Sequence, residues 1–189
     1  MSRLERSTSQ SPPSARGAES AHDWEQAIAS LKRKSLKMWL LINLFQWLAR
    51  LSQRSRMRIG AFLTHLTPWL IRKRIKIVSR NLELCFPELD AAQRQIMRQE
   101  HLRALTQSFV DRSVFWFGSA QTIRTLIKVT GHEQVPELLN THGSVMLLAP
   151  HFIGLDAAAT RLTLEGPEGA TMYTPQSNAD IDTLVRLGR

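Results

Sequence analysis

The alternation of apolar and polar positions predicts helices between residues 35 and 118. Residues 38–49 and residues 59–71 each form an apolar run. Residues 91–116 have a helical composition without Gly or Pro, behind Asp90 as a plausible N-cap and ahead of a break at Gly118. We therefore expect a helix in the first apolar run and a long helix over residues 91–116.

After Gly118, short apolar runs alternate with helix-like stretches. The runs predict strands at residues 126–130, 144–149 and 170–174. The stretches between and after them predict helices at residues 135–140, 154–164 and 179–187. This alternation is typical of an α/β layer. We therefore expect an α/β fold with a mostly parallel sheet and flanking helices, in which the strand 144–149 is buried on both faces.

The first apolar run has the pattern of an amphipathic helix. Its twelve residues would rise about 18 Å, whereas a bilayer core is about 30 Å thick, so the run is too short to cross a membrane alone. Asn43, Gln46 and Arg50 fall on one polar stripe, which leaves an apolar face formed by Leu41, Leu44, Phe45, Leu48 and Leu51. Basic residues flank both ends, which favours an interfacial membrane helix. A core helix of a soluble domain is the alternative.

The positive charge is concentrated in one region. Lys and Arg outnumber Asp and Glu by 25 to 16, yet no acidic residue lies between Gln26 and Leu82. That span holds thirteen basic residues: Lys32, Arg33, Lys34, Lys37, Arg50, Arg54, Arg56, Arg58, Arg72, Lys73, Arg74, Lys76 and Arg80. The excess indicates an anionic partner such as lipid, nucleic acid or an acidic protein, with a merely solvated surface as the alternative. Because the aromatic residues here sit within aliphatic runs, the pattern favours a membrane over nucleic acid.

These patterns divide the chain into three parts. Residues 1–34 read as a disordered basic tail, and residues 35–80, in which Pro68 interrupts the second apolar run, read as a membrane-associated helical anchor. Residues 81–189 read as the N-terminal part of an α/β domain. Three strands would leave an open sheet edge, so we expect the fold to continue beyond the last residue. The chain has one cysteine and no zinc-ligand or phosphate-loop spacing, and we expect no metal or cofactor.

His151 is the first candidate catalytic residue, because sites in parallel sheets form beyond the carboxyl ends of strands. Asp156 follows five residues later, about 140° away on a continuous helix. The two side chains can meet if His151 ends the strand and Asp156 lies in the next turn, which Gly154 would permit. A neutral imidazole can then take a proton from an attacking hydroxyl, while the carboxylate fixes its tautomer and stabilises the imidazolium.

A second pair has the same spacing. His132 also follows a predicted strand and precedes Glu137 by five residues. Spacing alone does not separate the two pairs, and either histidine could instead make a structural hydrogen bond. The long buried strand predicted before His151, and the small residues after it, favour His151.

Three segments, in order, resemble a known family. Residues 149–156, Ala-Pro-His-Phe-Ile-Gly-Leu-Asp, resemble the histidine-four-residues-acid motif of the lysophospholipid acyltransferase superfamily. Residues 80–89, Arg-Asn-Leu-Glu-Leu-Cys-Phe-Pro-Glu-Leu, are similar to a segment ahead of the long helix in the bacterial late acyltransferases of lipid A biosynthesis, of the lauroyl or myristoyl transferase type. Residues 172–178 resemble the block that follows the catalytic motif there.

The resemblance implies an O-acyltransferase at the cytoplasmic face of the inner membrane. Its donor would be acyl carrier protein, its acceptor a hydroxyl of a lipid A precursor, and its surface partner anionic membrane lipid, with no nucleic acid and no cofactor. His151 would be the general base and Asp156 the orienting acid, a position where many members carry Glu. Arg189, Gln176 and Asn178 would bind substrate or support the oxyanion.

Two other functions remain open. The chain could be an acyltransferase for a lysophospholipid or an ornithine lipid. It could instead be a non-enzymatic basic protein that binds membranes or nucleic acid, in which case binding to DNA or RNA would depend strongly on salt.

Overall fold

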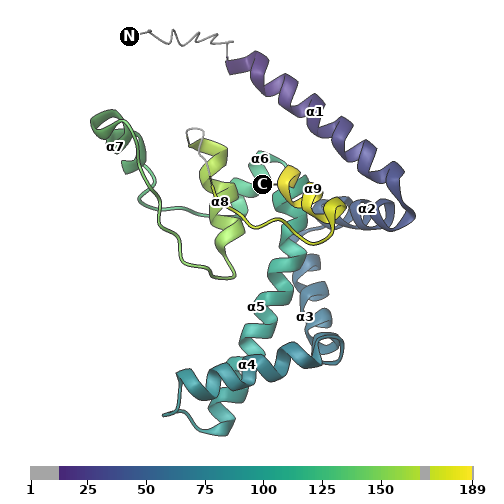
Figure 1. Ribbon diagram of the computed structural model, residues 1–189, viewed down its shortest axis with the longest axis vertical. Coiled ribbons are helices and arrows are strands. Elements are labelled where there is room, and N and C mark those ends of the chain that lie inside the picture. Colours follow the sequence, from purple (N-terminus) through teal and green to yellow (C-terminus); the bar gives the residue numbers. More distant parts are fainter. Residues whose placement is uncertain (1–12, 167–170, 189) are drawn as a thin grey trace, which may run out of the picture.

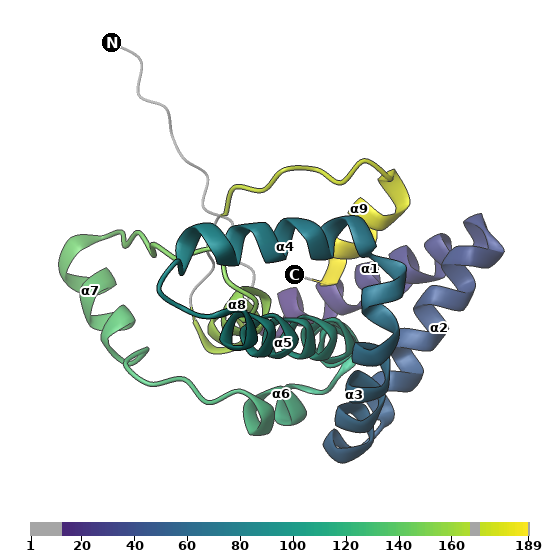
Figure 2. The same ribbon diagram turned by 90° about the horizontal axis from the view of Figure 1, so that it is seen from below.

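The computed structural model describes residues 13–166 and 171–188. Over these residues the chain forms nine α-helices and no β-strand. They are α1 (Pro13–Lys34), α2 (Leu36–Arg50), α3 (Gln53–Leu70), α4 (Arg72–Cys85), α5 (Ala91–Phe117), α6 (Ala120–Leu126), α7 (Gln134–His142), α8 (Leu155–Glu165) and α9 (Ala179–Gly188). Figure 1 shows α5 running through the centre of the molecule with α4 crossing its lower part, and Figure 2 looks nearly along α5, with α4 beside it.

The central helix α5 has defined signals at both ends. At its start, the Asp90 side chain accepts a hydrogen bond from Gln93 N at 2.8 Å, and the Gln93 side chain accepts one from Asp90 N at 2.9 Å. This reciprocal capping box satisfies backbone groups that the first turn leaves without helical partners. At its end, Gly118 takes an extended conformation. The prediction of a helix over residues 91–116 is confirmed.

The main core lies where α1, α2 and α9 meet α5. Its buried members are Ile28, Leu31, Met38, Ile42 and Leu184. Burial of each such side chain contributes about 1.5–3 kcal/mol. Phe45 of α2 extends the core by stacking on Trp116 of α5, with ring centroids 5.4 Å apart, and by an edge contact with Phe109. The aromatic residues thus fix α2 against α5.

The contact between α3 and α5 is close because α3 carries a glycine there. A Cβ at Gly60 would lie 2.2 Å from Gln107 Oε1. One turn later, the hydroxyls of Thr64 and Thr106 are 2.6 Å apart. The interruption predicted at Pro68 is not found, because α3 continues to Leu70. Pro68 falls in the last turn, where its missing N–H costs a single helical hydrogen bond.

The predicted α/β fold is wrong for residues 13–166 and 171–188. Leu126 ends α6, residues 144–149 form an irregular connection, and residue 170 lies outside the described residues. A strand needs a neighbour to pair its backbone N–H and C=O groups, and no described segment forms such a ladder with these runs. Met146 and Leu148 are 93% and 95% exposed, so the expected burial on both faces is also wrong.

Helix α1 corrects the expectation of a disordered tail over residues 1–34. Residues 13–34 are helical, and residues 1–12 of that tail lie outside the described residues. Trp24, Ile28 and Leu31 recur at spacings of four and three, which gives one apolar stripe. Because this stripe packs into the main core, the segment gains the burial that its polar composition did not suggest.

Helix α2 has two apolar faces. Met38, Ile42, Phe45 and Leu48 are buried, whereas an outward stripe is exposed, formed by Leu36, Leu40, Leu44 and Trp47. Lys32 of α1 donates to Asn43 Oδ1 at 3.1 Å and to Gln46 Oε1 at 2.8 Å. The predicted helix is confirmed, and it combines a core face with an exposed face. None of the helices in the described ranges has the length and apolarity needed to cross a bilayer.

Candidate functional site

Asp156 lies in the first turn of α8, where the helix dipole favours a negative charge. Arg112 of α5 donates from Nη2 to Asp156 Oδ2. The two side chains are 31% and 17% exposed, so the ion pair is partly shielded from water. The Arg112 guanidinium also lies 5.7 Å from the centroid of the Trp116 ring. The N-terminal end of α8 is therefore held against the central helix.

A tight turn leads into α8. Leu155 N donates to Phe152 O at 3.1 Å, and Ala158 N donates to Gly154 O at 3.0 Å. Gly154 has a φ of −81°, which any residue adopts, so the turn does not need glycine for its backbone conformation. A Cβ there would instead lie 2.9 Å from Phe152 Cε2. The close approach of the Phe152 ring explains the glycine.

His151 lies just before this turn, at the end of the long connection between α7 and α8. Its side chain is exposed. The structure thus places the two predicted catalytic residues on either side of one short turn, with the carboxylate anchored and the imidazole at the surface. Their pairing as a dyad stays a prediction.

The competing histidine, His132, has different acidic neighbours. Its Nε2 lies 3.8 Å from Glu165 Oε2, and its Nδ1 lies 3.4 Å from Glu133 Oε2 without a hydrogen bond. These are its ion-pair neighbours in the described part of the chain, and Glu137 is not among them. The pair predicted from spacing alone does not form.

Glu165 is the centre of this second cluster. Arg161 Nη1 donates to its Oε2, and Arg124 Nε donates to its Oε1 at 2.8 Å. The hydrogen bond from Arg161, followed by that from Arg124, lowers the pKa of the Glu165 carboxyl below its ordinary value. Since Arg124 belongs to α6, the cluster attaches the C-terminal end of α8 to α6.

Two of the three residues with a predicted supporting role, Gln176 and Asn178, lie just before α9. Asn178 Oδ1 accepts from Asp180 N and Ile181 N, both at 3.0 Å, and so caps α9. Gln176 N donates to Asp182 Oδ1 at 2.7 Å. Arg189 lies outside the described residues. Asn178 therefore has a structural task that the sequence did not predict, and the supporting roles stay predictions.

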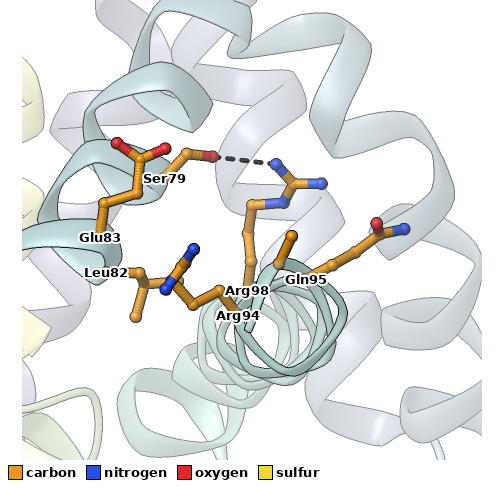
Figure 3. Close-up of a pocket in the computed structure, with 7 residues that line it drawn as sticks. Ser79, Leu82, Glu83, Arg94, Gln95 and Arg98 are labelled. Atoms are coloured by element: carbon orange, nitrogen blue, oxygen red, sulfur yellow. Dashed lines mark hydrogen bonds between the residues drawn. The ribbon is translucent and has the colours of Figure 1, made fainter. Parts of the chain in front are cut away.

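Two pockets flank α5 away from this turn. One, of about 140 Å³, lies between α4 and α5 and is shown in Figure 3, where Arg98 donates to Ser79 Oγ at 2.9 Å. The other, of about 530 Å³, lies between α3 and α5. Neither is lined by His151 or Asp156. These two pockets are therefore separate from the predicted catalytic pair.

Comparison with known protein families shows to which family this chain belongs. The sequence profile described as bacterial lipid A biosynthesis acyltransferase matches residues 25–189. The chain belongs to this family. The family recognised from three short motifs is thereby confirmed.

Individual lipid A acyltransferases are similar to the chain. It is 29% identical to the lipid A biosynthesis lauroyltransferase of Escherichia coli (strain K12), over 80% of this chain and 49% of that protein. It is 33% identical to a lipid A biosynthesis acyltransferase of Haemophilus influenzae, over 62% of this chain and 37% of that protein. It is 31% identical to the Escherichia coli palmitoleoyltransferase, over 70% of this chain and 42% of that protein. The chain spans half or less of the length of these relatives, and no solved structure matches it significantly.

Arg112, which binds Asp156, is a residue that the sequence did not indicate. It precedes Asp156 by 44 residues, so no local spacing links them. Its one sequence signal is its position in α5 between Val110 and Val114, both buried, which places a charge beside an apolar stripe. This position alone does not identify Asp156 as the residue that Arg112 binds.

Proposed function

We propose that this protein is an O-acyltransferase that moves a fatty acyl chain from acyl carrier protein to a hydroxyl of a lipid A precursor. The observation that carries the proposal is the family match over residues 25–189, which includes the whole stretch from His151 to Asp156. The similar lauroyltransferase and palmitoleoyltransferase, both named for lipid A biosynthesis, support the reaction class.

In the proposed reaction, His151 acts as the general base. Its neutral imidazole takes the proton of the acceptor hydroxyl as that oxygen attacks the thioester carbonyl. Asp156 orients the ring and stabilises the imidazolium. The tetrahedral intermediate then collapses, the C–S bond breaks, and the imidazolium returns its proton to the departing thiolate. No nucleophile from the protein is needed, because the acceptor supplies the hydroxyl.

The charge of α4 supports an acidic carrier protein as donor. Its exposed side chains include Arg72, Lys73, Arg74 and Lys76. Complementary charge raises the rate at which such a partner is captured. The same charge also suits the phosphates of the acceptor or of anionic lipid.

The outward stripe of α2 supports attachment to the cytoplasmic face of the inner membrane. Its four exposed apolar residues lie near the exposed basic residues Lys37 and Arg50. An apolar face edged by cations is the arrangement of helices that lie in the headgroup region of anionic bilayers. In this proposal α2 binds the surface and brings the site to its lipid substrates.

A substrate assay on the intact protein in membranes tests the function. Acyl carrier protein loaded with a fatty acid is supplied with either a phosphorylated disaccharide lipid or a lysophospholipid. We expect transfer to the disaccharide lipid and none to the lysophospholipid. The opposite preference would contradict the lipid A assignment and support a phospholipid acyltransferase. Replacing the carrier protein with coenzyme A as the acyl carrier tests the donor, and we expect a much lower rate.

A further inference from the structure

Helix α8 is held at both ends by arginine–carboxylate pairs. At its N-terminal end, Arg112 of α5 binds Asp156. At its C-terminal end, Arg124 of α6 binds Glu165. Both pairs are partly exposed: the side chains of Arg112 and Asp156 are 31% and 17% exposed, and those of Arg124 and Glu165 are 43% and 30% exposed. They differ in position, because only the first involves a residue of the proposed dyad.

We propose that Arg112 is a positioning residue that fixes the Asp156 carboxylate for His151. The inference rests on the proposed function, in which these two residues form the dyad. Arg112 does not itself touch substrate. It acts through the carboxylate, by limiting the orientations that the Asp156 side chain can take.

The residues that pack around Arg112 suit it to positioning the Asp156 carboxylate. Its guanidinium lies 5.7 Å from the centre of the Trp116 ring, and that ring stacks on Phe45, which is 2% exposed. The next residue, Ser113, is 0% exposed, so the α5 backbone at this point belongs to the core. A planar guanidinium beside a fixed aromatic ring loses little freedom when it binds a carboxylate. Arg112 therefore presents a rigid donor to a side chain on another helix.

The ion pair is compatible with the dyad. A carboxylate has two oxygens and about four acceptor positions, so a donor on Oδ2 does not exclude an imidazole N–H as a further donor. Asp156 also lies in the first turn of α8, at the positive end of the helix dipole. An error of about 1 Å in placing a catalytic group can cost about a hundredfold in rate. The loss of Arg112 should therefore be visible in turnover.

The alternative is that Arg112 only attaches α8 to α5. Arg124 is the matched control, because it holds the other end of the same helix through a comparable ion pair. If attachment alone matters, Arg112→Met and Arg124→Met will have similar effects on stability and on rate. If Arg112 positions the dyad, only Arg112→Met will lower the turnover of folded protein.

The test is a kinetic double-mutant cycle on the intact protein in membranes, with a lipid A precursor as acceptor. We expect Arg112→Met to lower kcat by about tenfold or more with little change in KM, because the loss falls on the transition state. In the Asp156→Asn background, the same change should alter kcat by less than about twofold, because the carboxylate that Arg112 holds is gone. Arg124→Met should stay within about twofold of wild type.

Chemical rescue separates positioning from folding. Added guanidinium ion should restore part of the kcat of Arg112→Ala, because the small cation can occupy the vacated position beside Asp156. It should not restore Asp156→Asn. Thermal unfolding of each variant checks that the compared proteins are folded.

The outcomes distinguish this inference from the proposed function. Loss of transfer in Asp156→Asn, with Arg112→Met near the wild-type rate, would overturn the positioning role and leave the dyad intact. Equal losses in Arg112→Met and Arg124→Met, or full additivity of Arg112→Met with Asp156→Asn, would assign Arg112 to helix attachment alone. Unchanged transfer by Asp156→Asn would overturn both the dyad and the role of Arg112.

Discussion

Arg56 on α3 reaches Asp111 on α5, with 3.4 Å between Arg56 Nε and Asp111 Oδ1. The Arg56 side chain is 3% exposed and that of Asp111 is 21% exposed. Arg56 Nη1 also donates to Leu51 O at 2.5 Å. A buried guanidinium therefore joins the basic helix α3 to the helix that carries Arg112.

Breaking this buried pair should destabilise the protein. Asp111→Asn removes the charge that balances the buried Arg56, so we expect the free energy of unfolding to fall by about 3 kcal/mol. Chemical denaturation measures the change. Arg58→Met removes an exposed arginine from the same helix and should cost no more than about 0.5 kcal/mol. Equal losses in the two variants would contradict the structural role of the pair.

Loss of the capping box of α5 should lower the free energy of unfolding by less than loss of the Arg56–Asp111 pair. Asp90→Ala removes the acceptor for Gln93 N, and we expect a loss of about 1 kcal/mol in the free energy of unfolding. Glu88→Ala, two residues earlier and exposed, is the control and should be close to neutral. If Asp90→Ala has the same free energy of unfolding as wild type, α5 does not depend on this cap.

The Glu165 cluster predicts a pH dependence of stability. The pKa of this carboxyl is lowered from its ordinary value of 4.5, first by Arg161 and then by Arg124. The folded state therefore binds the Glu165 proton less readily than the unfolded state, so its stabilising contribution is present above about pH 4.5 and is lost as the pH falls through the lowered pKa. We expect the protein with Glu165 to exceed its Glu165→Gln variant in Tm above that pH, and the difference to vanish in stronger acid.

Both proteins in that comparison carry His132→Gln, because His132 lies 3.8 Å from Glu165 and would add its own titration. A difference in Tm that persists unchanged into strong acid would show that the Glu165 charge is not responsible.

The outward stripe of α2 should control membrane binding. Leu40→Glu places a charge on a side chain that is 53% exposed, so the fold should tolerate it while partition onto vesicles of anionic lipid falls at least about tenfold. Flotation with the vesicles measures this partition. Leu138→Glu makes the same change at a 40% exposed position on α7 and should not affect binding. Equal binding by wild type and Leu40→Glu would place the membrane contact elsewhere.

Helices whose signals are local were predictable from the sequence. The cap at Asp90, the break at Gly118 and the apolar periodicity of residues 38–49 act within a few residues, and α5 and α2 form where they indicate. In contrast, α1 was not predicted, because the three apolar residues of its stripe lie among many polar residues. Their burial depends on α9, which lies more than a hundred residues away.

The predicted strands and part of the site depend on information that a local pattern does not hold. The run 144–149 has the composition of a buried strand, but a strand forms only when another segment pairs with it. Likewise, the sequence showed that His151 follows an apolar run and precedes a tight turn. The link from Arg112 to Asp156, in contrast, spans 44 residues and two intervening helices, α6 and α7. The family motifs were recognisable because each is contiguous in the sequence.

The most direct test of the central claim compares two histidines. The intact His151→Ala and His132→Ala proteins are assayed in membranes for transfer from acyl carrier protein to a lipid A precursor. General-base catalysis contributes about 10²–10⁴-fold, so we expect His151→Ala to lose at least about a hundredfold in rate while its membrane attachment survives. His132→Ala should remain within about twofold of wild type. Transfer by His151→Ala at a rate near that of wild type would contradict the account.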